Sequence, residues 1–541
     1  MLNTCLRKIV TRSVLTIMVM ASAARPANSQ QISDTNVGAE EQRKAIDDLV
    51  QQNKKLEQQN RDLEEQNRKL EQQNKQILDR LDSLQAPAAQ AKGAQTAQPQ
   101  PQSVSPHPDS TQPSVAVAAK PQINVQRPGQ PANQNDDKTL LPEASDGNPA
   151  MFGEFNPGRG FTVAQGEFGS LNLSGYMVAR YLNQLPADQS ATDHLGRPVT
   201  INPRQDFQFH RVMLFSQGWL FSRNFQYLAF LWTVQDTNQV AIGGALTYRF
   251  GKYLTLGGGW NAYPGTQSLQ GSHPYWTSYD RVMADEFFRP YFSQGVFGEG
   301  KLHPTFEYRF LVGNNLSNLD VPATKISRDL SSGFALTWLP TTREFGPRGA
   351  FGDYENHEKL ATRFNLAYTY SPEDRQNPIG QPAGNTTLRL SDSLNVFDTG
   401  ALADRVTVSK TRYQLVSAAA GMKYHGLWIQ GEGYGRRLDN LVADGVLPVK
   451  AVRNSGFYLQ VADMIVPKRI ELYGGTSYIF GDFSHPKEFL VGGNYYPWNT
   501  RNIRLNLHLI NVDHSPVSST FGFYTGKATG QIFAFGMTAL Y

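Results

Sequence analysis

The feature that most constrains the fold of this chain is a two-residue period in hydrophobicity that recurs from about Leu171 to the last residue, Tyr541. In the segment IRLNLHLINV, residues 503–512, apolar and polar side chains alternate almost without a break. Successive side chains of a β-strand point to opposite faces of the sheet. The period therefore predicts strands with one apolar face and one polar face.

We expect about sixteen such strands, each close to the ~10 residues that a tilted membrane strand needs. Aromatic residues make up 11% of the chain and glycines number 47, which suits many short strands separated by turns. No apolar run approaches the ~20 residues of a spanning helix. The expected strands begin near Leu171, Phe207, Phe225, Val240, Leu254, Tyr291, Thr305, Gly333, Thr362, Arg412, Leu427, Gly456, Ile470, Lys487, Ile503 and Gly530.

The expected fold is therefore an all-β transmembrane barrel of about 16 antiparallel strands over residues 165–541. A soluble barrel would bury its apolar face, whereas a membrane barrel turns that face to lipid and keeps the polar face in the lumen.

The connections between the expected strands alternate between tight turns and long segments. The long ones are expected at 183–206, 264–289, 316–332, 371–411 and 439–455. Outer-membrane barrels show this asymmetry, with short periplasmic turns and long external loops. Residues 340–360 form a long connection on the side of the tight turns, which suggests that one strand there is misplaced.

The last expected strand, GQIFAFGMTALY, is apolar on one face and ends in an aromatic residue. A chain terminus is normally polar and frayed, so this strand is expected to close the barrel. Its ending resembles the signal by which the barrel assembly machinery recognises outer-membrane proteins, which makes that machinery an expected partner, together with the lipids of the outer membrane.

The N-terminal 150 residues differ in every respect from the barrel. Residues 1–29 are typical of an export signal, with basic residues followed by the short apolar stretch VLTIMVMASAA and cleavage after Ala24 or Ser29. A short membrane anchor is the alternative. The single cysteine, Cys5, lies in this signal, so the mature chain is expected to hold no disulfide and no cysteine-based metal site.

After an N-terminal segment at 30–45, residues 46–84 repeat every seven residues, as in LEQQNRD and LEEQNRK. This repeat predicts a parallel coiled coil and hence a homo-oligomer; a solvated single helix or a disordered tract is the alternative. Asparagines at core positions fix register at a cost in stability. The oligomerisation residues are Asn53, Asn60, Asn67 and Asn74, with Leu56, Leu63 and Leu70. Residues 85–150, rich in proline and glutamine, are expected to be a linker.

Two stretches, FQFHRVMLFSQGWLFSRNFQYLAFLW at 207–232 and SYDRVMADEFFRPYFSQGVFGEG at 278–300, resemble the phosphate-selective porin O and P family. The resemblance implies a trimer of sixteen-stranded barrels in which the third external loop, here 264–289, folds into the lumen. Phosphate selectivity in that family is associated with lysine at the constriction, whereas this loop has none. The candidate constriction residues are Asp280, Arg281, Asp285, Glu286 and Arg289. The alternative is that the loop lies over the outer rim.

Because side chains alternate between the two faces of a strand, the polar positions of each expected strand give a second set of candidates, whose side chains are expected to line the lumen. Each charged member is either a selectivity group or a structural wall charge paired across strands. The set is Arg249, Glu307, Arg309, Arg363, Asn365, Arg504, Asn506 and His508.

The expected function is a passive diffusion channel of the bacterial outer membrane for small hydrophilic solutes, including anions such as phosphate, with the N-terminal region in the periplasm. The chain carries none of the local sequence motifs G-x-S-x-G, H-E-x-x-H or a P-loop, so no enzyme activity, cofactor or metal is expected. A net charge of +4, spread over the chain, does not form the clustered basic surface that nucleic-acid binding needs. An outer-membrane hydrolase and an envelope tether, in which the barrel anchors a coiled coil bound to the cell wall or another periplasmic partner, are the alternatives.

Overall fold

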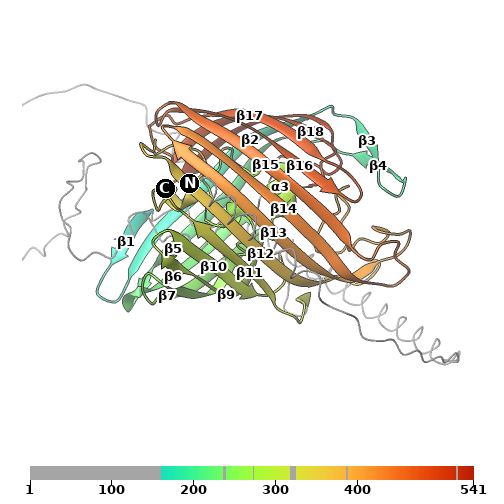
Figure 1. Cartoon of the computed structure of the whole chain (residues 1–541), viewed down its shortest axis with the longest axis horizontal. Coiled ribbons are helices and arrows are strands. Elements are labelled where there is room, and N and C mark those ends of the chain that lie inside the picture. The colour runs from blue at the N-terminus through green and yellow to red at the C-terminus, as the bar shows by residue number, and fades with distance from the viewer. Residues whose placement is uncertain (1–159, 235–238, 272, 317–324, 386–387, 519–521) are drawn as a thin grey trace, which may run out of the picture. The chain divides into compact units, whose positions relative to one another are not determined.

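The computed structural model describes residues 160–541, apart from 235–238, 272, 317–324, 386–387 and 519–521 (Figure 1). The predicted export signal, coiled coil and linker lie outside the described residues.

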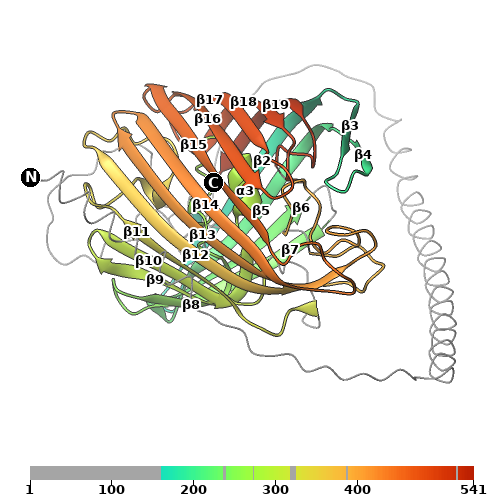
Figure 2. The same ribbon diagram turned by 45° about the vertical axis from the view of Figure 1, so that its right-hand side comes forward.

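Sixteen antiparallel strands form a closed barrel, as the hydrophobic period predicts (Figures 1 and 2). Each strand pairs with its neighbours in the sequence, and β19 pairs with β2 to close the ring. All sixteen predicted strands are confirmed. They are β2 Ser170–Leu185, β5 Gln205–Leu220, β6 Ser222–Val234, β7 Gln239–Arg249, β8 Thr255–Ala262, β9 Phe292–His303, β10 Phe306–Gly313, β11 Ser331–Trp338, β12 Ala361–Asp374, β13 Val408–Tyr424, β14 Leu427–Ala443, β15 Val452–Val466, β16 Ile470–Gly481, β17 Lys487–Tyr495, β18 Ile503–Asp513 and β19 Gly530–Leu540.

The closing register runs from the Gln531 and Leu185 pair to the Leu540 and Tyr176 pair, so the last strand is paired along nearly its whole length. Beyond the C-terminal end of β19, the short strand β1, Phe161–Gln165, continues the wall by pairing with the start of β2. A two-stranded hairpin of β3, Gln189–Thr192, and β4, Pro198–Ile201, projects from the opposite end.

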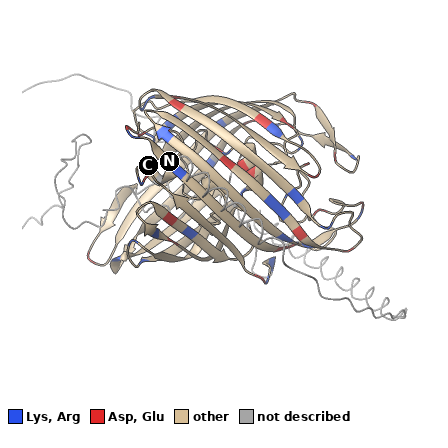
Figure 3. Cartoon of the chain, viewed as in Figure 1, with Lys and Arg blue, Asp and Glu red and all other residues tan. Residues whose placement is uncertain are grey.

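The barrel wall has an apolar outer face and a polar inner face, and its strands carry both basic and acidic residues (Figure 3). In β18 and β19 the outward side chains of Leu507, Phe535 and Met537 are 47%, 43% and 46% exposed, whereas the inward Asn506 is fully buried. Exposed apolar side chains on every second wall residue suit a lipid environment and oppose the pattern of a soluble barrel. Within the described residues, no helix combines the length and the apolar character needed to cross a membrane.

The two ends of the barrel differ. At the end where β2 begins, which we call the turn end, most strands are joined by tight turns such as His425–Gly426. At the other, loop end, most connections are longer, such as 186–204 between β2 and β5 and 375–407 between β12 and β13. The exception is 339–360, which joins β11 to β12 at the turn end and contains the 3₁₀ turn η5, Pro347–Gly349.

The length of this connection does not reflect a misplaced strand, so the expectation of an error there was wrong. β11 and β12 pair in continuous register from Ser332 and Tyr370 to Trp338 and Phe364. The segment between them folds inward instead. Arg363 on the inner face of β12 donates to the carbonyl of Gly349 at 2.9 Å, and the Phe351 ring stacks on Trp428 at 5.2 Å between centroids. A long turn-end connection is possible here because it packs inside the barrel.

Candidate functional site

The connection from β8 to β9, residues 263–291, folds into the barrel instead of lying over its rim. It contains the 3₁₀ turn η3, Gln267–Leu269, and the short helix α3, Met283–Phe288, which contacts β15 and β16 (Figure 2). All six residues of α3 are buried. Because the segment is bonded to inward-facing side chains of many strands, its position is set by the wall.

The first set of bonds holds the middle of the segment. Arg504 on β18 donates to two of its carbonyls, that of Trp276 at 2.5 Å and that of Ser278 at 2.9 Å. Arg211 on β5 forms an ion pair with Asp280 at 3.0 Å. Hydrogen bonds from a charged donor contribute more than neutral ones, typically about 1.5–3 kcal/mol each, so these two wall arginines are strong anchors.

The start of α3 is held by a wall carboxylate. The backbone N–H of Met283 donates to Glu488 Oε1 on β17 at 2.7 Å, and the hydroxyl of Tyr524 donates to the other oxygen at 2.7 Å. The first N–H groups of a helix have no partner within the helix. Glu488 supplies one from outside it and places a negative charge at the favourable end of the helix.

The part of the segment before residue 272 is bonded to another side of the lumen, formed by β10, β12 and β14. The Gln267 N–H donates to Glu432 on β14 at 3.0 Å. The Gln270 amide exchanges hydrogen bonds with Asn365 on β12, and Arg309 on β10 donates to the Gln270 carbonyl at 2.5 Å. The segment therefore spans the lumen between wall groups on β5, β10, β12, β14, β17 and β18.

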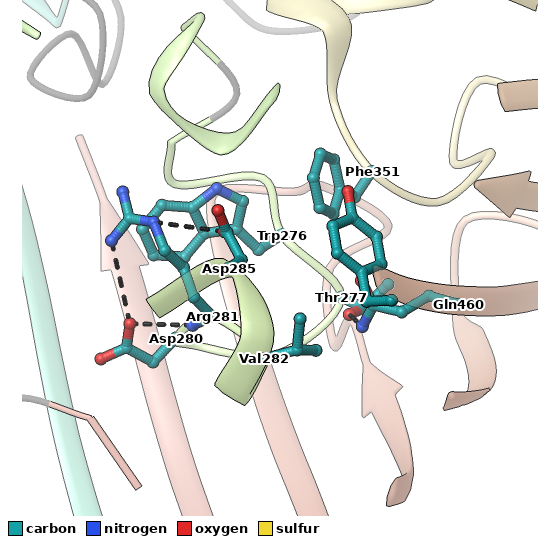
Figure 4. A pocket seen from close by; sticks show the side chains of 9 residues that line it. Trp276, Thr277, Asp280, Arg281, Val282, Asp285, Phe351 and Gln460 are labelled. Carbon is teal, nitrogen blue, oxygen red and sulfur yellow. Dashed lines mark hydrogen bonds and ion pairs between the residues drawn. The ribbon is translucent and has the colours of Figure 1, made fainter. Parts of the chain in front are cut away.

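The five candidate constriction residues all lie on this segment and are paired within it. Figure 4 shows three of them, Asp280, Arg281 and Asp285. Arg281 lies 3.7 Å from Asp285 and 4.0 Å from Asp280, and its guanidinium lies 4.0 Å from the centre of the Trp276 ring. Arg289 binds Glu286 through two hydrogen bonds of 2.7 Å. Burial raises the pKa of the Asp285 carboxyl, and the neighbouring Arg281 opposes that shift.

The predicted lumen residues all fall on the inner face of their strands. Three of them, Arg363, Asn365 and Arg504, are buried and bond to in-folded segments. Asn506 and His508 are also buried, and both bond to the hydroxyl of Tyr473 on the neighbouring wall.

The other three predicted lumen residues are Arg249, Glu307 and Arg309, each half-buried on its inner face. Arg309 pairs with Glu299 at 3.0 Å, and Glu307 pairs with Lys301 at 2.9 Å. These cross-strand pairs fit the alternative reading of some wall charges as structural.

Two wall glycines were missed by the sequence reasoning, although they position the segment. A Cβ at Gly536 on β19 would lie 2.4 Å from the Tyr279 ring, and one at Gly456 on β15 would lie 2.7 Å from the Phe288 ring. Each glycine is thus a socket for an aromatic side chain of the segment. A glycine at an inward position of a strand often marks such a close approach. The inward glycines on the predicted strands were therefore a signal that the sequence offered.

The two in-folded segments meet inside the lumen. The N–H of Phe351, from the turn-end segment 339–360, donates to the carbonyl of Tyr275 at 2.8 Å. Next to this contact lies a pocket of about 230 Å³, counting the space open to solvent (Figure 4). Asp280, Arg281 and Asp285 share its lining with Phe351 and Tyr458 on β15.

One group of side chains in the described residues has the donor atoms of a metal site. Asp353, Glu355 and His357 place ligand atoms within 4.8 Å of one another in the turn-end segment. However, the Lys423 ammonium lies 3.9 Å from Glu355 and Arg501 lies 3.1 Å from it. Cations already neutralise this carboxylate, and Asp353 accepts hydrogen bonds from His357 and from the Gly426 N–H. The group is therefore better explained as an ion-pair network than as a metal site.

No protein-family model matches the chain, and no characterised protein matches its sequence. Several solved outer-membrane proteins resemble its structure. OmpT of Vibrio cholerae has a TM-score of 0.44 at 9% identity, covering 70% of this chain and 99% of that one. The outer membrane channel DcaP of Acinetobacter baumannii has a TM-score of 0.41 at 11% identity, covering 71% and 99%. An anion-selective porin from Comamonas acidovorans has a TM-score of 0.40 at 12% identity, covering 69% and 100%.

Proposed function

We propose that the chain is an outer-membrane porin, a passive diffusion channel for small hydrophilic solutes whose constriction is formed by segment 263–291. The observation that carries the proposal is a charged segment anchored across the lumen of a barrel with an apolar outer face. A barrel that only anchors another domain in the membrane needs no charged segment inside it. The tether alternative is accordingly not favoured.

Passage through such a channel needs no covalent step. Solutes are selected by the width of the passage and by the sign of the charges along it. In a narrow, partly dehydrated passage, unit charges 4 Å apart interact by about 4 kcal/mol at an effective dielectric of ~20. Charges on the segment and on the wall groups that touch it should therefore dominate selectivity.

We propose a weak preference for anions. Basic groups on or touching the segment outnumber the acidic ones. The basic side chains include Arg211, Arg281, Arg289, Arg309, Arg436, Arg501 and Arg504, and the acidic ones are Asp280, Asp285, Glu286, Glu432 and Glu488. The small cationic excess favours anions, and phosphate is the first anion to test because of the resemblance to phosphate-selective porins. The segment contains no lysine, so we do not expect strong phosphate selectivity.

We also propose how the barrel closes and how the chains associate. The paired C-terminal strand β19 provides the edge that the barrel assembly machinery would recognise and close. The predicted coiled coil at 46–84 would link three chains on the periplasmic side, through Asn53, Asn60, Asn67 and Asn74.

The test is a planar-bilayer recording of the purified, detergent-extracted full chain. We expect discrete, ohmic single-channel steps of small size, because several segments pack inside the lumen. Reversal potentials in a potassium chloride gradient should show a modest anion preference, and phosphate added to one side should compete with chloride. Complete absence of conductance steps from correctly folded, heat-modifiable protein would contradict the proposal.

A further inference from the structure

Charged side chains on the inner face of the barrel, near its turn end, differ sharply in exposure from one side of the lumen to the other. On β9 and β10 the side chains of Lys301 and Glu307 are 50% and 24% exposed, and those of Arg309 and Glu299 are 23% and 18% exposed. Arg249, at the end of β7, is also half-buried. Inner-face side chains can be this exposed only where the lumen beside them is open to water.

Charged inner-face residues near the turn end of other strands are covered. Arg363 on β12 is 3% exposed, Glu471 on β16 is 2% exposed, and Lys423 on β13 is fully buried. These three residues lie as close to a strand end as Lys301 and Glu307 do. Position along the strand therefore does not explain the difference in exposure.

The cover on that side is segment 339–360, which enters the lumen from the turn end. Arg363 donates to its backbone, and its Glu355 carboxylate lies 3.9 Å from the Lys423 ammonium. A Cβ on Gly352 would collide with the Glu471 carboxylate, so the segment runs directly against β16. These contacts place the segment over β12, β13 and β16. The inner faces of β7 to β10 are left open, as the exposure of their charged side chains shows.

The open sector adjoins segment 263–291, the proposed constriction. Arg309 belongs to the sector and donates to the carbonyl of Gln270 at 2.5 Å. Strand register places Arg249, Thr255, Glu299 and Arg309 in one row across β7 to β10. The pairing of Arg309 with Glu299 does not remove these charges from the solution, because ion pairs this exposed stay hydrated and weak. Both charges can therefore act on an ion that passes.

We propose that the lumen opens at the turn end through this sector, and that the charged side chains there form a second, weaker charge filter for small hydrophilic solutes. The charged residues of this turn-end opening are Arg249, Glu299, Lys301, Glu307 and Arg309. Three are basic and two are acidic, so the opening favours anions weakly, as the constriction does. The inference rests on the proposed function, since a solute that has passed segment 263–291 would leave along this wall.

Cysteine labelling tests the opening without any need for conduction. Thr255→Cys and Thr538→Cys are a matched pair on the inner face near the turn end, one in the open sector and one on β19, where Thr538 is 2% exposed. The folded, detergent-extracted full chain is labelled with a water-soluble maleimide, and the mass of the peptide that contains the new cysteine is measured, so that Cys5 does not contribute. We expect Thr255→Cys to react about tenfold faster or more, because a covered site is reached only when its cover opens. Equal labelling rates would overturn the inference.

Charge variants test the filter through the reversal potential in a potassium chloride gradient. Lys301→Gln should lower the permeability ratio of chloride to potassium about twofold, and Glu307→Gln should raise it about as much, since half-exposed charges act through water of high dielectric constant. Lys468→Gln is the matched control, because it removes the same charge from the exposed turn between β15 and β16 and should leave the ratio unchanged. Parental ratios in both Lys301→Gln and Glu307→Gln would overturn the filter. If no variant and no parent conducts, the proposed function and the filter both fail, whereas a persisting contrast in labelling would leave the opening itself standing.

Discussion

A single methyl group at Gly536 should loosen segment 263–291 from the wall. The Cβ of Gly536→Ala would lie 2.4 Å from the Tyr279 ring, closer than real Cβ contacts allow. Overpacking of this kind costs about 1–3 kcal/mol. The strand is held by continuous pairing on both sides, so the segment and not the barrel should give way. Because each 1.4 kcal/mol changes an equilibrium constant tenfold, the population in which the segment is undocked should rise about fivefold to 150-fold.

Trypsin cleavage after Arg281 reports that population. Arg281 is 4% exposed in the docked segment, and Arg289 is protected from trypsin in any state by the following Pro290. Cleavage follows the population of the open form when closing is fast, and the peptide that ends at Arg281 can be measured by mass spectrometry. Gly435→Ala is the matched control, because a Cβ there meets nothing within 4 Å. Equal cleavage rates in the two variants would refute the reasoning.

Three further predictions concern assembly, the coiled coil and pH. Removing residues 532–541 deletes most of the closing strand and should abolish heat-modifiable protein in the outer membrane; normal assembly would argue against a membrane barrel. Replacing the four core asparagines between Asn53 and Asn74 with isoleucine should raise the melting temperature of peptide 40–85 and broaden its oligomer states; light scattering on the parent peptide should give three chains, and two would show the trimer to be wrong. Hydrogen bonds to Asp353 and Glu344 raise the pKa of His357 to about 9, above its unfolded value of ~6.5. The protonated His357 should therefore stabilise segment 339–360 fully below pH ~6.5, and this stabilisation should be lost as the pH rises through about 9. His357→Gln should remove this pH dependence from the hydrogen exchange of the segment, and an unchanged profile would contradict the prediction.

The strands could be predicted because the period of two acts locally and repeats. In β18 the alternation from Ile503 to Leu509 fixes which side chains face inward, and the structure has Arg504, Asn506 and His508 there. Even the long connection at 340–360 was visible as an anomaly. The sequence did not reveal why this connection is long, because the contacts that hold it, such as Arg501 to Glu355, join residues 146 positions apart.

The lumen contacts were the part that sequence could not supply. The resemblance correctly pointed to an in-folded third loop, but strand parity cannot say which wall group meets which loop residue. Arg211 and Glu488 became anchors only when the closed barrel brought them to Asp280 and Met283. The wall glycine Gly536 carries no charge or motif, and its role depends on the Tyr279 ring on another segment.

The reversal potential of charge variants in a salt gradient tests most directly the claim that segment 263–291 governs passage. Arg281→Glu with Arg289→Glu should move permeability toward cations, and Asp285→Asn with Glu286→Gln should move it toward anions. As a control, Arg405→Glu changes a residue whose side chain is 91% exposed in a loop, where charges are screened within ~10 Å at 0.1 M salt, and should have no effect. If both double variants keep the parental reversal potential and conductance, the segment does not form the constriction.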